Sequence, residues 1–257
     1  MRYTSTRNQD IDVGFADALL MGYAPDGGLF VPRTELPPFN GATLRTWRQL
    51  DYATLMEHIL RLYIDPEELS DAELTEACQN AMEGFEDPAH AVKVVPLRRP
   101  DDPSGDAAAT TAVPQLFLSE LFHGPTFCFK DLGLRVVIQL LHVFTQRRQQ
   151  KALTLVVATT GDTGPAAVQA VADLPPTSRV RIVVAYPQGQ ISDFQRRQMT
   201  TTTTQRDSVR IVAFAGGGDD MDGPIHNVLR GKDASTALRT GVNSYNIVCL
   251  QSDEYDG

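Results

Sequence analysis

The sequence has 257 residues, of which 42% are hydrophobic and 21% are charged, and its formal net charge is −9. This composition is typical of a soluble globular protein with a sizeable core, in one large domain or two smaller ones. A net negative charge repels a nucleic-acid backbone, so nucleic acid is excluded as a partner. A small anion can still bind at a helix N-terminus or a glycine-rich turn.

The cysteine, histidine and hydropathy patterns exclude further classes of protein. The three cysteines are far apart and contain no Cys-x-x-Cys pair, and the five histidines show no metal-ligand spacing. We therefore expect no disulfide framework, no metal site and a reducing compartment. No apolar run has the length of a signal peptide core or a membrane span, which indicates a cytoplasmic protein that binds no membrane.

Residues 1–90 are predicted to form a mostly helical domain. Apolar residues recur at helical spacing over residues 52–63 and again over 74–81. Ser70-Asp71 is a typical helix start between these two segments. The segment 24–32, Ala-Pro-Asp-Gly-Gly-Leu-Phe-Val-Pro, predicts a tight turn followed by a short extended piece.

Residues 91–257 are predicted to form an α/β domain. Short runs of β-branched or other apolar residues indicate strands at 115–118, 154–158, 180–185 and 209–214. An amphipathic helix is expected from residue 132 to about 149. Apolar strands that alternate with helices favour a parallel sheet covered on both faces. Residues 100–112 and the threonine run 200–204 are expected to be surface insertions.

The first candidate site residue lies in the nonapeptide His-Gly-Pro-Thr-Phe-Cys-Phe-Lys-Asp, residues 123–131. Lys130 follows the apolar residues 127–129 and directly precedes the amphipathic helix. An amine with such an apolar flank loses its proton more easily and becomes a better nucleophile or Schiff-base former. Taken alone, however, Phe-Lys-Asp is more typical of a surface lysine at a helix start.

The second candidate follows the strand predicted at 154–158. Residues 159–166, Thr-Thr-Gly-Asp-Thr-Gly-Pro-Ala, form a strand-to-helix turn whose backbone N–H groups can bind an anion. An ordinary helix cap by Asp162 or Thr163 explains the same residues. The later segment 216–220, Gly-Gly-Gly-Asp-Asp, is more typical of a flexible connection. Neither segment matches the Gly-x-Gly-x-x-Gly or P-loop pattern.

In this order the motifs resemble threonine synthase, a pyridoxal-phosphate (PLP) family with the tryptophan-synthase-β fold (fold type II), in its fungal and bacterial branch. The matching segments extend along nearly the whole chain and comprise residues 3–7, 24–30, 121–131, 158–164, 186–192, 198–201 and 242–246. The resemblance implies an α/β protein in which a mostly helical N-terminal domain, 1–90, precedes the first part of the PLP-binding domain, 91–257.

The resemblance also implies a role for particular residues. Lys130 would hold PLP as a Schiff base and later move protons on the substrate carbons. The substrate's α-carboxylate and the cofactor's edge would be gripped by four residues of one turn, Thr160, Gly161, Asp162 and Thr163. Asn243 and Asn246 would lie near the site. The family's reaction, part of threonine biosynthesis, converts O-phosphohomoserine and water to threonine and phosphate.

The family's cofactor-phosphate loop lies beyond the last residue of this chain, and residues 251–257 resemble nothing in the family. We therefore expect a fragment, an alternatively terminated product or an inaccurate gene model, which exposes strand edges and apolar surface. Such a chain should by itself bind PLP poorly and lack activity. Two alternatives stay open: a phospholyase that releases a 2-keto acid, and a non-catalytic binding protein. The nearest basic candidates for a substrate phosphate are Arg33, Lys93 and Arg135.

Overall fold

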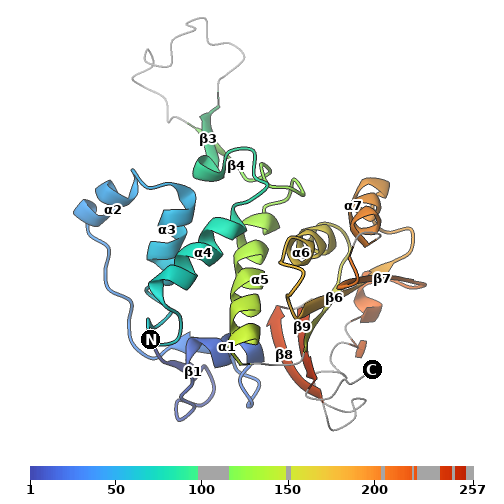
Figure 1. Ribbon diagram of the computed structural model, residues 1–257, viewed down its shortest axis with the longest axis horizontal. Coiled ribbons are helices and arrows are strands. Elements are labelled where there is room, and N and C mark those ends of the chain that lie inside the picture. The colour runs from blue at the N-terminus through green and yellow to red at the C-terminus, as the bar shows by residue number, and fades with distance from the viewer. Residues whose placement is uncertain are drawn as a thin grey trace, which may run out of the picture.

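The computed structural model describes residues 1–97, 116–148, 152–203, 206–221, 223–224, 238–244 and 247–252. Figure 1 shows a helical N-terminal part on one side, a sheet on the other, and helix α5 (Lys130–Arg147) between them. Within the described residues, none of the helices has the length and hydropathy needed to cross a bilayer. Helix α5 lies between the helical part and the sheet, which are the two parts of the molecule that the sequence distinguishes.

The N-terminal part is mostly helical, as predicted. Its helices are α1 (Phe15–Met21), α2 (Gly41–Trp47), α3 (Tyr52–Leu60), α4 (Asp71–Ala81) and the 3-10 helix η1 (Pro88–His90). Strands β1 (Tyr3–Ser5) and β2 (Phe30–Pro32) form a small antiparallel sheet, which confirms the extended piece after the predicted turn. Helix α4 begins at the predicted position because the side chains of Ser70 and Glu73 cap each other's backbone N–H groups.

Helix α5 contributes to two hydrophobic cores. Val136, Leu140 and Phe144 pack with buried residues of the N-terminal helices. Ile138 and Leu141 pack with the strands of the sheet. Because one helix fills both cores, the division into domains 1–90 and 91–257 stays a prediction.

The central sheet confirms the predicted parallel α/β arrangement. Strands β5 (Ala152–Ala158), β6 (Val180–Pro187) and β7 (Val209–Phe214) are parallel and are connected by α6 (Thr163–Ala172) and α7 (Asp193–Thr203). Strands β8 (Leu238–Ser244) and β9 (Ile247–Ser252) add an antiparallel pair, in the order β7-β6-β5-β9-β8. The edge of β5 is therefore covered by β9, and the sheet is mixed.

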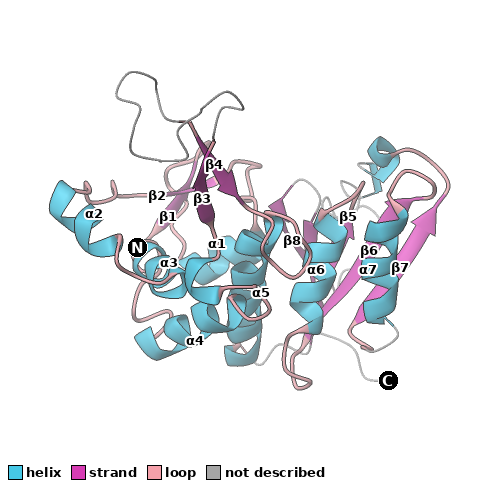
Figure 2. Ribbon diagram, turned by 90° about the horizontal axis from the view of Figure 1, so that it is seen from above, coloured by secondary structure: helices cyan, strands magenta, loops and turns pink. Residues whose placement is uncertain are grey.

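The predicted covering of both faces of the sheet is incomplete in the described residues. On β5, Leu153, Leu155 and Val157 are buried, whereas Thr154 and Val156 between them are partly exposed. Strand β6 alternates in the same way from Val180 to Val184, and its remaining residues are buried. Because side chains alternate between the two faces of a strand, one face is buried along its length, whereas the other is partly exposed at Thr154, Val156 and Val183. Figure 2 shows α6 and α7 side by side over β6 and β7 on the buried face.

Two further predictions need correction. The run predicted as a strand at 115–118 belongs to β4 (Phe117–Glu120), which pairs antiparallel with β3 (Lys93–Pro96) outside the central sheet. Its side chains are largely exposed, because nothing in the described residues covers them. The threonines 200–203 are not an insertion but the end of α7. Residues 100–112, Thr204 and Asn246 lie outside the described residues.

Candidate active site

Three connections meet at the carboxyl edge of the parallel strands, where open α/β sheets bind ligands. They are the turn 159–162 after β5, residues 188–192 after β6, and residues 215–217 with the 3-10 helix η2 (Gly218–Met221) after β7. Gly218 approaches the turn so closely that an added Cβ would lie 2.5 Å from Thr160 Cγ2. The segment 216–220 is therefore packed against the candidate site, where the sequence predicted only a flexible connection.

Residues 121–129, here called the site loop, lead into helix α5. Asp131 of that helix is fully buried, and its carboxylate accepts hydrogen bonds from Thr126 N–H at 2.9 Å and Thr126 Oγ1 at 2.7 Å. Gly124 leaves room for this carboxylate, since an added Cβ would lie 2.5 Å from Asp131 Oδ2. Burial raises the pKa of Asp131, and the bonds from Thr126 oppose that shift. Asp131 thus fixes the loop that ends at Lys130.

Phe127 has a backbone conformation that bulky residues rarely adopt. Its φ is 59°, and it is the non-glycine residue with positive φ in the described part of the chain. Its N–H donates to Gly124 O at 3.0 Å, while its side chain is 60% exposed. Such strain persists where the surroundings determine the conformation, and it clusters at functional sites.

Lys130 and Asp162 come together from the first turns of two helices. Lys130 is the first residue of α5, and its Nζ lies 3.0 Å from Asp162 Oδ2 at the start of α6. Nζ also lies 4.5 Å from the centre of the Phe129 ring, a cation–π distance. The lysine side chain is 28% exposed and the aspartate 46%. The structure therefore places Lys130 in a paired and partly solvent-accessible position, not free on the surface.

Asp162 does not act as the ordinary helix cap that its position permits. It occupies the N-cap position of α6, but its side chain makes no capping hydrogen bond. Burial raises the pKa of this carboxyl, but hydrogen bonds from Cys128 and Lys130, together with the charge of Lys130, lower it and outweigh burial, so the net pKa lies below its ordinary value. The ionised carboxylate therefore faces the Lys130 amine and not its own helix.

Thr159 organises the turn, and the sequence did not single it out. Its side chain is buried, and Oγ1 accepts the N–H groups of Gly161 at 3.1 Å and Gly164 at 3.0 Å. A threonine directly after a strand carries no special signal in one sequence, since threonine is common in strands. Its role follows only from the fold of the turn.

The other predicted residues of the turn lie beside the pair. Thr160 is exposed, Gly161 is buried and Thr163 is the first residue of α6. Asn243 lies on β8 next to Ser244, which pairs with Ile247, and Ile247 in turn pairs with Val157. The backbone of Asn243 is therefore at the carboxyl end of β5, one strand removed from it.

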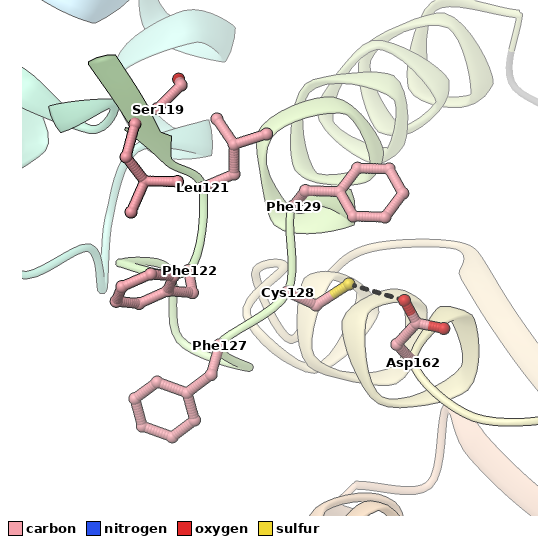
Figure 3. A pocket seen from close by; sticks show the side chains of 8 residues that line it. Ser119, Leu121, Phe122, Phe127, Cys128, Phe129 and Asp162 are labelled. Carbon is pink, nitrogen blue, oxygen red and sulfur yellow. Dashed lines mark hydrogen bonds between the residues drawn. The ribbon is translucent and has the colours of Figure 1, made fainter. Parts of the chain in front are cut away.

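An open cavity of about 420 Å³ lies between the site loop, β4 and Asp162. Figure 3 shows Leu121 and Phe122 on one side and Phe129, Cys128 and Asp162 on the other, with Phe127 pointing away. Its lining is mainly apolar and is completed by Leu118 and Ser119. Aromatic walls with few polar groups are typical of a site for a flat organic ligand.

The basic residues suggested for a substrate phosphate have other partners. Arg135 is buried; its Nε donates to Ala81 O at 2.8 Å and its Nη1 to Asp173 Oδ2 at 2.6 Å. The suggestion is therefore wrong for Arg135, which is part of the interior. Arg33 lies 3.4 Å from Asp12, and Lys93 lies 3.4 Å from Glu86.

A charged cluster around His123 supports the start of the site loop. His123 is buried, and its ring nitrogens lie 2.8 Å from Glu86 Oε2 and 2.8 Å from Glu120 Oε2. The two carboxylates, Glu120 first, raise the pKa of His123. Lys93 Nζ lies 3.4 Å from the same ring. Among the described residues, no group of three His, Cys, Asp or Glu side chains has an arrangement that could hold a metal ion, and this also applies to the residues around His123.

Together these features define an α/β protein with a lysine–carboxylate site at the carboxyl edge of parallel strands. A family model described as the threonine synthase N terminus matches residues 2–82. Threonine synthase-like 2 of Mus musculus is 35% identical over 248 residues, which are 96% of this chain and 46% of that protein. Threonine synthase of Saccharomyces cerevisiae is 34% identical over 254 residues, 95% of this chain and 46% of that protein.

The solved structures agree. The PLP-bound threonine synthase from Brucella melitensis has a TM-score of 0.77 and 31% identity, and the match covers 96% of this chain and 48% of that one. The chain belongs to the threonine synthase family, and it spans about half the length of the relatives it matches.

Proposed function

We propose that this chain carries the cofactor lysine of a PLP-dependent enzyme that converts O-phosphohomoserine and water to threonine and phosphate. The observation that carries the proposal is the 3.0 Å contact of Lys130 Nζ with Asp162 Oδ2 beside an aromatic cavity. An accessible amine with an adjacent proton acceptor fits a cofactor that is bound through a carbonyl carbon. Family membership and the PLP-bound Brucella relative support the choice of cofactor.

The chain's own residues would divide the work as follows. Lys130 Nζ would hold the cofactor and move protons, and Asp162 Oδ2 would accept the proton that the amine releases. The first N–H groups of α6, near Thr160, Gly161 and Thr163, would bind the substrate's carboxylate, because a helix N-terminus favours an anion. Asn243 would lie at the rim of the same site. When bound, PLP supplies an electron sink for carbanion charge on the substrate.

Reductive trapping tests the cofactor assignment. The protein is incubated with PLP, reduced with borohydride and digested, and the phosphopyridoxyl label is located by mass spectrometry. We expect the label on Lys130, with Lys93 as an internal reference because it is a paired lysine elsewhere in the fold. Trapping also records weak binding, which we expect for this polypeptide alone. Equal labelling of Lys93 and Lys130, or unchanged labelling in Lys130→Ala, would contradict the assignment.

The reaction itself needs a separate test, because a phospholyase remains the second candidate. The chain is about as similar to threonine synthase-like 2 as to yeast threonine synthase, at 35% and 34% identity. Product analysis with O-phosphohomoserine separates them: threonine supports the synthase, and a 2-keto acid supports the lyase. PLP trapping without either product, from the longest polypeptide that the gene encodes, would instead favour a binding role. The cytoplasmic location stays a prediction.

A further inference from the structure

Cys128 contacts both partners of the lysine–carboxylate pair. Its thiol donates to Asp162 Oδ2 at 3.1 Å, the oxygen that Lys130 Nζ contacts at 3.0 Å. Its sulfur also accepts the backbone N–H of Lys130 at 3.4 Å. Figure 3 shows the thiol pointing at the carboxylate across the gap between the site loop and the start of α6. One side chain thus links the first peptide of α5 to the first carboxylate of α6.

The thiol is a neutral hydrogen-bond donor at physiological pH. Burial raises the pKa of Cys128 to about 11; the N–H of Lys130 lowers it and Asp162 raises it. A thiol that keeps its proton is a poor nucleophile, so a role as a reactive cysteine does not fit. A buried neutral donor beside a carboxylate instead stabilises the ionised form of that carboxylate.

We propose that Cys128 is a positioning residue that holds Asp162 Oδ2 against Lys130 Nζ. Asp162 makes no capping bond to its own helix and is 46% exposed, so without a second donor its carboxylate is free to rotate toward solvent. With the thiol and the ammonium on one oxygen, the carboxylate has a fixed orientation as the proton acceptor of the lysine. The titratable groups that face Asp162 are Cys128 from the site loop and Lys130 from α5, and α7 contributes the neutral Gln195 near Gly161.

The inference rests on the proposed function for its consequence but not for its geometry. Two variants separate the hydrogen bond from the volume of the side chain: Cys128→Ala removes the donor, and Cys128→Ser restores one. Cys78→Ala is the matched control, because Cys78 is a buried free thiol in the N-terminal core. Thermal unfolding of each variant verifies that it is folded.

The first measurement is the pKa of Asp162, which is determined by titration of its carboxyl ¹³C NMR signal in the protein without cofactor. We expect this pKa to rise in Cys128→Ala, to return toward the wild-type value in Cys128→Ser and to stay unchanged in Cys78→Ala. An unchanged Asp162 pKa in folded Cys128→Ala overturns the proposal, whatever the cofactor does.

The second measurement is the rate of PLP attachment at Lys130, by borohydride trapping over time. We expect a fall of about three- to fivefold in Cys128→Ala, the factor for one weak hydrogen bond, and recovery in Cys128→Ser. If wild-type Lys130 takes no PLP while the Asp162 pKa still responds to Cys128, the proposed function fails and the positioning role stands. If PLP attaches to Lys130 at the same rate in the wild type, Cys128→Ala and Cys128→Ser, the positioning role of Cys128 fails and the proposed function stands.

Discussion

Two cation–carboxylate pairs connect helix α5 to the two ends of helix α6, and they differ in cation and in solvent exposure. Lys130 meets Asp162 at the first turn of α6, and Arg135 meets Asp173 at its far end. The lysine side chain is 28% exposed, whereas the arginine side chain is 3% exposed. Charge and spacing on one helix therefore do not distinguish a site from a structural element; solvent access and the second partner do.

The choice of cation agrees with this division. Arginine stays charged and binds with a planar fork, which suits a permanent interior contact such as the one from Arg135 to Asp173 and Ala81 O. A lysine amine can lose its proton and form a covalent bond. The Lys130 side chain retains access to solvent, which a reacting amine needs.

The largest expected effect comes from breaking the interior pair. Arg135→Met leaves the Asp173 carboxylate and the Ala81 carbonyl without their buried donor. We expect the free energy of unfolding, measured by urea denaturation, to fall by about 3 kcal/mol. Lys130→Met is the matched variant at the exposed pair and should cost less than about 1 kcal/mol. A similar loss in both variants would show that the two pairs do not differ as proposed.

We expect a substitution of the buried Asp131 to lower the free energy of unfolding by an amount between those for the Arg135 and Lys130 variants. Asp131→Asn places an amide donor against one of the two Thr126 donors, which should cost about 1–3 kcal/mol. Because burial raises the native pKa of Asp131, the native protein keeps this proton at a pH where the unfolded chain has lost it. The stability of the wild type relative to Asp131→Asn should therefore fall as pH rises from about 4 through the raised native pKa.

That dependence is measured as the difference in unfolding free energy between the two proteins at several pH values. Taking the difference cancels the other carboxylates, which titrate in both proteins. A difference that is constant with pH, or that grows as pH rises, would contradict a raised pKa for Asp131.

The smallest expected effect is at His123, where the carboxylates of Glu120 and Glu86 raise the histidine pKa. The resulting stabilisation is fully present below the unfolded pKa of about 6.5 and is lost as pH rises through the higher native pKa. His123→Gln should remove this pH dependence between those limits. Histidine NMR titration gives the native pKa directly, and a value at or below the unfolded one would rule the effect out.

Local sequence signals predicted much of the secondary structure. Ser70 and Glu73 form the cap that starts α4, and the apolar stripe of residues 132–144 forms α5. These signals depend on neighbours within one or two turns, so they survive without knowledge of the fold. The run at 115–118 was assigned to the wrong sheet for the opposite reason, because its leucine- and phenylalanine-rich composition does not specify which strand lies beside it.

The site shows the same division. Lys130 and the turn 159–163 were found from their motifs, but the roles of Thr159, Cys128 and Asp131 were not. Each of these side chains acts through a hydrogen bond whose partner is set by the folded loop. The pairing of Cys128 with Asp162 spans 34 positions of sequence, which no local pattern encodes.

The sequence by itself determined the family, the helix starts, the alternation of strands and helices, and the position of Lys130. Only the tertiary structure decided that Asp162 faces Lys130 instead of capping α6, that Arg135 is interior, and that one face of the sheet is partly exposed in the described residues. The physical reason is that propensity and capping are local, whereas burial and the choice of a hydrogen-bond partner depend on which distant segments the fold brings together.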